Sequence, residues 1–368
     1  MRKLCLIASA SMLAFNLAFA QWTYDPSTKV LTDNTARLNA DVNNDSELTI
    51  TKCLEVGAIL DFSTPVTDSF GTNYTIVTIN FGVFRNKTGI TKLVYPSTIR
   101  TINGEAFHGC SGITEVHPAL VPDSVTSFNT SGRGVYEGCT SITQDFRIGY
   151  SPITTGGGQW FARTEVAVAD FGPYITTIPN FCFENTPVKE LRLSEGLVHF
   201  YGGSGVWGNL TNIVNAFPST LKTLNDCQVF RGNANLQVPE IRLENVTSLG
   251  ANFYGSKVPK IWFGPDIVKF PDWLFQGDNH VTNMTICATN AITSIGSAAF
   301  SDMDEMQEFT FMGPAQSTSI LNTIFANITD LRPVAYVSRN QGGWDELSGL
   351  ITDRDAIRQT LTEAQCEQ

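Results

Sequence analysis

The residue types that usually carry out catalysis are sparse in this chain and form no recognisable motif. The four histidines, His108, His117, His199 and His280, are scattered along the sequence. No serine or cysteine stands in the strand–turn–helix context of a hydrolase nucleophile. No cysteines or histidines have the spacing of a metal site. The sequence therefore predicts that the protein is not an enzyme and needs no cofactor.

Two polar segments have a superficial likeness to ligand-binding loops. The segment 41–47, Asp-Val-Asn-Asn-Asp-Ser-Glu, places oxygen ligands at alternating positions, as a calcium loop does. The sixth position of such a loop needs glycine and here is Ser46, while the twelfth needs glutamate and here is Lys52. The three glycines at 156–158 lack the Lys-Ser/Thr that follows a phosphate-binding loop. A polar hairpin turn is therefore expected at 41–47, and the glycines at 156–158 are not expected to bind phosphate.

Charged side chains recur around a short pattern in which one residue separates two apolar residues. In a β-strand the apolar pair points inward, so the residue before it and the residue between point outward. The outward residues form two columns, and the candidate binding residues are Glu115, Asp145, Asp170 and Glu190 in the first column and Arg147, Arg192, Arg242 and Trp262 in the second. A row of acids is unfavourable unless neighbouring arginines compensate for it or a cationic partner binds.

An internal repeat of about 24 residues predicts the elements that must position these side chains. Its first mark is a pair of apolar residues separated by two others, at 76–79, 99–102, 125–128, 175–178, 197–200, 221–224, 246–249, 267–270 and 292–295. An aromatic column follows, and we expect a single buried row from Phe84, Phe107, Phe183, Phe253, Phe275 and Phe300. The alternating strand pattern completes most units.

A unit of this length cannot bury its apolar face alone, so stacked units must bury these faces against one another as a solenoid. The alternating segments then form a parallel sheet with strands about 4.8 Å apart. A right-handed parallel β-helix, whose coils have a similar length, is the alternative fold.

Two segments resemble BspA-type leucine-rich repeats: residues 99–116, Ile-Arg-Thr-Ile-Asn-Gly-Glu-Ala-Phe-His-Gly-Cys-Ser-Gly-Ile-Thr-Glu-Val, and residues 292–311. The resemblance covers residues 76–337, and it implies a right-handed leucine-rich-repeat solenoid of β-rich α/β class with a parallel sheet and about 10–11 units. It also implies a surface or secreted protein that acts in adhesion or interaction.

The ends of the chain differ from the repeats. Residues 21–75 contain strand-like segments separated by polar turns, which predicts an N-terminal β cap over the first unit. Residues 338–368 have apolar residues at helical spacing, and Asp353 is a candidate N-cap, which predicts a C-terminal helical cap.

Residues 1–20 have the pattern of a cleaved export signal. Arg2 and Lys3 precede an apolar run, and Ala18 and Ala20 occupy the small-residue positions of a cleavage site. No later segment reads as a membrane-spanning helix. The protein is therefore expected to be secreted or held at the cell surface. The net charge of −11 argues against nucleic acid as a partner, because phosphate backbones attract basic surfaces.

Cysteine usage is low for a disulfide scaffold. Of the eight cysteines, Cys5 lies in the export signal, which leaves seven, an odd number. Cys110 and Cys139 hold the cysteine position of the family in adjacent repeats. We expect their Cα atoms to lie within about 7 Å, which makes the pair a disulfide candidate.

The resemblance, together with the signal-like residues 1–20, implies an exported, non-catalytic binding or adhesion protein whose ligand is a protein or a glycan. One alternative is a glycan-binding or glycan-active solenoid, which exposed aromatic residues beside paired carboxylates would favour. The other is a structural component of a surface layer, which would assemble without a ligand.

Overall fold

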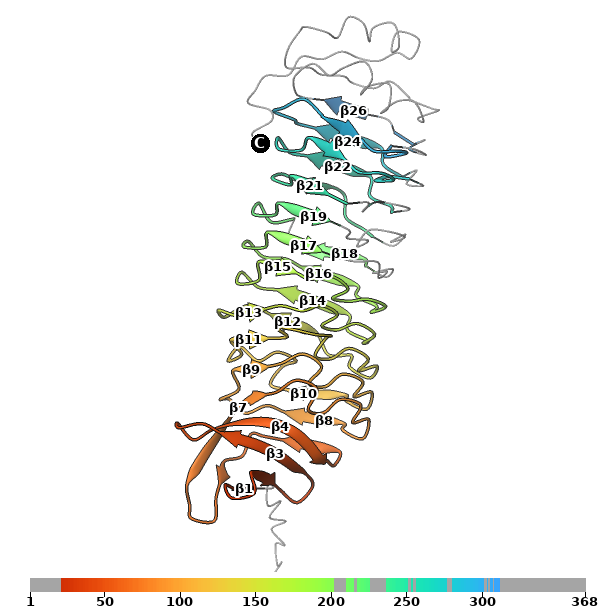
Figure 1. Ribbon diagram of the computed structural model, residues 1–368. Helices are drawn as coiled ribbons and strands as arrows, with labels where there is room; N and C mark the ends of the chain where they lie inside the picture. Colours follow the sequence, from red (N-terminus) through yellow and green to blue (C-terminus); the bar gives the residue numbers. More distant parts are fainter. Residues whose placement is uncertain are drawn as a thin grey trace, which may run out of the picture.

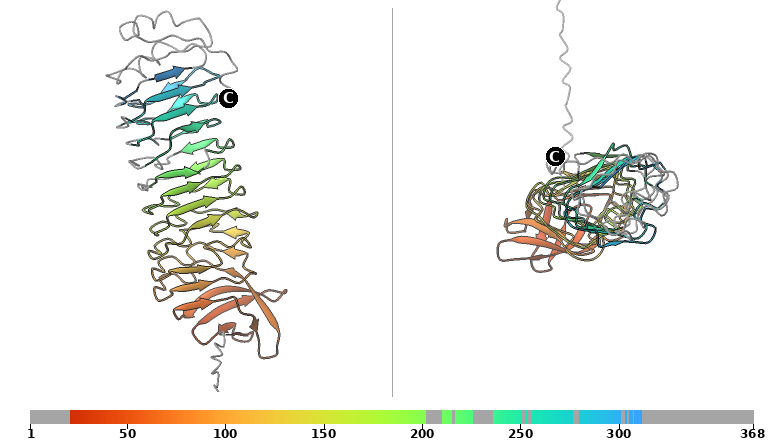
Figure 2. Two further views of the ribbon diagram at one scale, coloured as in Figure 1. Left: turned by 180° about the vertical axis from the view of Figure 1, so that it is seen from behind. Right: turned by 90° about the horizontal axis from the view of Figure 1, so that it is seen from above.

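The protein is an elongated stack of short β-strands, seen from two sides in Figures 1 and 2. The computed structural model describes residues 21–201, 210–214, 217–225, 236–250, 253, 256–276, 280–300, 303, 305, 306 and 308–311. The predicted export signal at 1–20 and the predicted helical cap at 338–368 lie outside these residues.

The alternating segments form a first row of parallel strands, here called the first strand row. It consists of three sheets, whose strands in chain order are β5 (Ile59–Asp61), β8 (Lys92–Val94) and β10 (Glu115–His117); β12 (Phe146–Ile148), β14 (Val168–Phe171), β16 (Glu190–Arg192) and β18 (Asn212–Val214); and β20 (Ile241–Leu243), β22 (Lys260–Phe263), β24 (Asn283–Ile286) and β26 (Glu308–Phe311). The predicted parallel sheet is therefore present along most of the stack.

The paired apolar residues that begin each unit form a second row of parallel strands, which the sequence did not predict. This second strand row contains β7 (Asn73–Ile79), β9 (Thr101–Ile102), β11 (Ser127–Phe128) and β13 (Thr154–Thr155); β15 (Thr177–Ile178), β17 (His199–Tyr201), β19 (Thr223–Asn225) and β21 (Ser248–Leu249); and β23 (Lys269–Phe270) and β25 (Ser294–Ile295). Figure 1 shows the two rows running side by side along the stack.

Turns complete each unit, and the described residues contain no helix. The amide of Phe84 donates to the carbonyl of Ala106 in the next unit at 2.8 Å, so backbone hydrogen bonds link the units on this side too. Glu105 and Gly109, on either side of Phe107, have φ angles of 56° and 70°. Left-handed residues so close together break a helix. The expected α/β class is therefore wrong for the described residues, which are all β.

The aromatic column forms a buried row, as predicted. Phe84, Phe107, Phe183, Phe253, Phe275 and Phe300 are each at most 2% exposed. Successive ring centroids are 5.2 Å apart for Phe84–Phe107, 5.7 Å for Phe107–Tyr136, 5.4 Å for Tyr136–Phe161, 5.9 Å for Phe161–Phe183, 5.2 Å for Phe253–Phe275 and 5.7 Å for Phe275–Phe300. Equivalent rings of neighbouring units therefore pack against each other along the axis.

The N-terminal strands form a closed ring of hydrogen-bonded pairs. Four strands pair antiparallel, each with the next along the chain: β1 (Trp22–Asp25), β2 (Val30–Thr32), β3 (Arg37–Val42) and β4 (Glu47–Glu55). The ring then closes, because β4 pairs with β7, β7 with β6 (Val66–Thr67), and β6 with β1. The ring leaves these six strands without a free edge within it. Because β7 also pairs with β9, the ring is continuous with the second strand row. Its role as a cap stays a prediction.

The five described cysteines are all free and buried, so the candidate disulfide between Cys110 and Cys139 is not formed. The Cys110 thiol donates to the carbonyl oxygen of Phe84 at 2.9 Å, and the Cys139 thiol donates to that of Phe107 at 3.1 Å. The Phe107 carbonyl also accepts from the Cys110 amide at 3.0 Å, so the two cysteines do lie side by side. Each thiol points to the backbone of the preceding unit instead of to the other thiol.

Candidate functional site

All eight predicted binding residues belong to the first strand row or directly precede it, but the register of one was wrong. Asp170 was predicted in the acidic column beside Asp145. It pairs instead with Arg147 on β12 and with Arg192 on β16, which places it in the second column. On β14 the first-column position is occupied by Val168, which pairs with Glu190 on β16. The expected continuous row of four acids is therefore broken, and one acid lies between two arginines.

The error has a simple physical cause. The inward pair of β14 is Ala169 and Phe171, both fully buried. Alanine at the first inward position does not stand out as apolar, so the predicted pattern began two residues late. A shift of two residues keeps a side chain on the same face and moves it to the other column.

The strands β12, β14 and β16 bring together a connected group of polar side chains, here called the central cluster: Asp123, Arg147, Tyr150, Asp170, Glu190 and Arg192. The Arg147 guanidinium lies 3.2 Å from Asp123 and 3.7 Å from the centre of the Tyr150 ring. The Tyr150 hydroxyl donates to Asp170 at 2.5 Å. Arg192 lies 3.9 Å from Asp170 and donates to Glu190 at 2.6 Å. Two of the members, Asp123 and Tyr150, lie in turns and were not predicted.

A glycine makes room for the aromatic member of the central cluster. A Cβ atom on Gly172 would lie 2.9 Å from the Tyr150 ring and 2.4 Å from the carbonyl oxygen of Gly149. Only glycine therefore allows the turn after β14 to approach the turn after β12 this closely.

The charges of the central cluster are coupled to one another. The hydrogen bond from Arg192 to Glu190 and the attraction between them raise the pKa of Arg192. Burial and then the hydrogen bond to Asp170 raise the pKa of Tyr150. Three carboxylates, those of Asp123, Asp170 and Glu190, face the two guanidinium groups of Arg147 and Arg192. The surface is therefore acidic, and Asp145, exposed beside it, increases this character.

The upper candidate residues form a separate group. Arg242 and Trp262 are neighbours in the second column, as predicted. The Arg242 guanidinium covers the Trp262 ring at 4.5 Å from its centre and lies near Glu240 and Glu244. Trp262 is only 9% exposed, so the expectation of an exposed tryptophan is wrong.

Glu115 forms a third group on β10. Its carboxylate lies 3.1 Å from Lys92 and 3.4 Å from His117. The hydrogen bond from Lys92, followed by that from His117, lowers the pKa of Glu115. The predicted site is therefore three groups along one face, of which the central cluster is the largest.

A buried carboxylate outside this face was also missed. Glu137 is fully buried in the turn after Tyr136, and its carboxylate oxygens have no hydrogen-bond partner among the described residues. An imidazole and two guanidinium groups surround it at longer range: His108 at 3.5 Å, Arg163 at 3.6 Å and Arg133 at 3.8 Å. Adjacent units bring these side chains together, whereas the sequence scatters them.

A family comparison accounts for the repeat. The model of the BspA type leucine rich repeat region, in 6 copies, matches residues 77–204 and 206–332. The chain belongs to the BspA-type leucine-rich repeat family. Among curated proteins none matches this BspA-type chain. Its described residues contain no cluster of side chains suited to a metal ion, and no helix of theirs has the length and hydrophobicity to cross a bilayer.

Three solved structures are similar to this BspA-type chain at low identity. A leucine-rich repeat protein from Bacteroides ovatus is 16% identical, with a TM-score of 0.46 and coverage of 88% of this chain and 98% of that one. A leucine rich cell surface protein from Faecalibacterium prausnitzii is 17% identical, with a TM-score of 0.42 and coverage of 86% and 96%. The pneumococcal vaccine antigen PcpA is 15% identical, with a TM-score of 0.37 and coverage of 83% and 98%.

Proposed function

We propose that this BspA-type protein is exported, remains at the cell surface or is secreted, and binds a basic protein ligand without catalysis through the central cluster. The observation that carries the proposal is the coupled group of arginine, tyrosine and carboxylate side chains on β12, β14 and β16. Membership of a family typical of surface proteins and the signal-like residues 1–20 support the location.

The composition of the central cluster suits a protein partner. Tyrosine and arginine are enriched among the residues that dominate binding energy at protein interfaces. Arg147 and Arg192 each retain about half of their side-chain exposure, at 48% and 45%, so both are accessible to a ligand. The ion pairs hold both side chains in place before binding, which reduces the entropy lost on association.

The acidic character of the central cluster indicates that the partner carries positive charge. Complementary charge speeds encounter and selects partners, and this effect weakens as salt is added. We therefore expect a ligand with a basic surface patch. The glycan alternative is less well supported here, because Arg147 covers one face of the Tyr150 ring, which a sugar would need for stacking.

A binding screen of the mature chain against purified matrix proteins tests the proposal. The double variant Asp145→Lys/Asp170→Lys should weaken binding of the ligand at least tenfold, because it replaces two attractive charges with two repulsive ones. The matched control is Asp45→Lys/Asp266→Lys, which makes the same charge change at exposed acids elsewhere.

Equal binding by the parent and the Asp145→Lys/Asp170→Lys variant would contradict the proposal, provided that both are folded. Self-association of the parent without any ligand would favour the surface-layer alternative. Loss of binding in both double variants would indicate an effect of net charge alone.

A further inference from the structure

The turns that contain the aromatic row carry a second charged surface, separate from the first strand row. Here called the basic edge, it consists of Phe81, Arg85, Arg133 and Arg163. The three arginines lie in the turns of three different units, and their side chains are 48%, 51% and 51% exposed. A chain with a net charge of −11 therefore presents a local group of accessible cations.

The acids that pair with these arginines lie beneath them. Arg85 donates to Glu105 at 2.7 Å, and the Glu105 side chain is only 9% exposed. Arg133 and Arg163 flank one oxygen of the fully buried Glu137. A group that approaches from solvent therefore meets the guanidinium groups at a shorter distance than the carboxylates. Because Coulomb energy falls with distance, the basic edge attracts anionic groups.

Two of the guanidinium groups keep hydrogen-bonding capacity for a ligand. The Glu137 carboxylate accepts no hydrogen bond among the described residues, although Arg133 and Arg163 approach it to 3.8 and 3.6 Å. Glu137 therefore holds the two side chains by charge alone, and their N–H groups do not donate to it. A guanidinium presents its donors as a planar fork that matches the geometry of a carboxylate.

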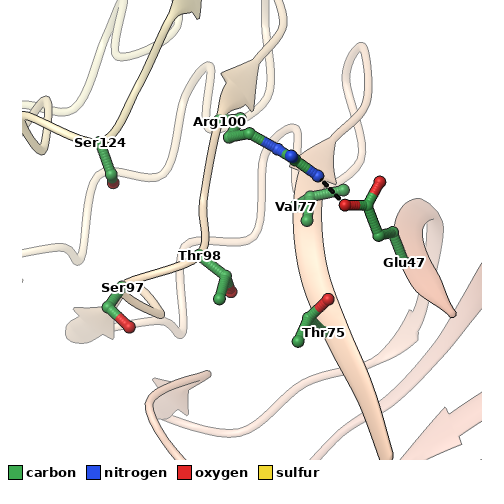
Figure 3. Close-up of a pocket in the computed structure, with 7 residues that line it drawn as sticks. All are labelled: Glu47, Thr75, Val77, Ser97, Thr98, Arg100 and Ser124. Atoms are coloured by element: carbon green, nitrogen blue, oxygen red, sulfur yellow. Dashed lines mark hydrogen bonds and ion pairs between the residues drawn. The ribbon is translucent and has the colours of Figure 1, made fainter. Parts of the chain in front are cut away.

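The arginine at a pocket beside the second strand row differs in this respect. Figure 3 shows Arg100 reaching across that pocket to Glu47, whose side chain is 24% exposed. An ion that enters the pocket meets both charges, so the pocket favours neither sign. At the basic edge the paired acids are buried, and the accessible charge of the pairs is positive.

An insertion in the repeat brings Arg133 to the basic edge. The segment that joins the second strand row to the aromatic residue has seven residues at 129–135, whereas it has four at 103–106 in the preceding unit. The longer segment packs on that unit, since the amide of Glu105 donates to the carbonyl of Arg133 at 3.2 Å. Insertions in repeat proteins often mark the binding face.

The remaining member of the basic edge is apolar. The Phe81 side chain is 49% exposed. Its ring lies against the backbone of Gly132, directly before Arg133, because a Cβ atom on this glycine would lie 2.6 Å from the ring. Aromatic and arginine side chains together are typical of residues that dominate binding at protein interfaces.

We propose that the basic edge binds a short acidic segment of a protein, in which carboxylates flank an aromatic or aliphatic residue. The carboxylates pair with Arg133 and Arg163, and the apolar residue packs on Phe81. A long polyanion is disfavoured, because the net charge of −11 repels it beyond the basic edge. The next unit also places Glu184 beside Arg163, whose amide donates to the Glu184 carbonyl at 2.8 Å. This site is separate from the central cluster and does not depend on the function proposed for it.

Selection of random dodecapeptides displayed on phage, with the immobilised mature chain as target, tests this surface. We expect one enriched group of peptides to carry acidic residues around an aromatic or aliphatic residue. A synthetic peptide of that group is then titrated calorimetrically. Arg133→Gln/Glu137→Gln/Arg163→Gln should bind it about tenfold or more weakly, because two charge-assisted contacts are lost and no buried charge is left unpaired. Phe81→Ala should bind it about three- to tenfold more weakly.

The matched control is Lys29→Gln/Arg37→Gln/Asp41→Asn, which removes two exposed cations and one acid from the N-terminal ring and should bind as the parent does. Absence of an acidic group among the selected peptides would overturn the proposal. Equal affinity of the parent and the folded triple variant at the basic edge, or equal losses in this variant and the control, would overturn it as well. Displacement of the peptide by heparin, with Phe81→Ala binding the peptide as the parent does, would assign the basic edge to an anionic glycan instead.

Discussion

Phe107→Ala is expected to be strongly destabilising, because the Phe107 ring is stacked between two other rings of the aromatic row. The ring is fully buried, and its neighbours Phe84 and Tyr136 lie 5.2 and 5.7 Å away with interplanar angles of 5° and 11°. Truncation of a buried phenylalanine to alanine costs about 3–5 kcal/mol, from lost burial and the cavity left behind. Two stacked neighbours place the expected loss in the upper half of that range.

Urea denaturation followed by tryptophan fluorescence and circular dichroism measures this loss. The matched control is Phe70→Ala, which removes the same ring from a site that is 88% exposed. It should change the free energy of unfolding by less than about 0.5 kcal/mol. A Phe107→Ala variant that unfolds at the urea concentration of the parent would refute the stacked aromatic core. Similar losses for both variants would refute it as well.

Three further predictions concern packing, charge and thiol chemistry. Gly134→Ala should cost about 3 kcal/mol in the same assay, because its Cβ would lie 1.6 Å from the Gln159 carbonyl oxygen, whereas Gly89→Ala, with nothing within 4 Å, should be neutral. Glu137→Gln should cost about 1–3 kcal/mol because it leaves the guanidinium groups of Arg133 and Arg163 without their buried counter-charge, and unchanged stability would contradict this. Burial raises the pKa of Cys110 to about 12 from 9.0, so this thiol should resist alkylation until the chain unfolds. The free energy of unfolding should fall as pH rises from 9 toward 12, because only the unfolded chain then loses the thiol proton. Rapid alkylation of Cys110 in the native protein would refute its burial.

The features that the sequence predicts well are those in which every unit contributes the same type of residue. Phe107, Phe183 and Phe275 recur beside the same apolar neighbours, and a side chain that is apolar in every unit must face the interior of the stack. The strand positions follow from the same logic, since the alternating pattern has a period that only a strand satisfies. The aromatic row and the first strand row could therefore be predicted without coordinates.

The features that the sequence hides depend on contacts between units or on single backbone angles. Glu105 and Arg163 adopt φ angles of 56° and 58° although neither is glycine, so the residue types of these turns do not indicate their backbone conformation. The N-terminal ring closes through the pairing of Trp22 with Val66, far apart in the chain.

The candidate site was predicted in outline for the same reasons. Outward orientation follows from strand alternation, which placed Arg147 and Arg192 correctly. A correct prediction of the column of Asp170 requires that Ala169 be recognised as a core residue. The Arg242 guanidinium covers the Trp262 ring, and this side-chain conformation cannot be predicted from the periodicity of the sequence.

Carboxyl footprinting with and without bound ligand tests most directly the claim that the central cluster is the binding surface. The mature protein is labelled with a carbodiimide and an amine in the presence and absence of the matrix protein that it binds, and each modified carboxylate is located by mass spectrometry. The bound ligand is expected to protect Asp145, Asp170 and Glu190 and to leave Asp45 and Asp266 as reactive as before. Unchanged labelling of Asp145, Asp170 and Glu190 in the saturated complex would contradict it.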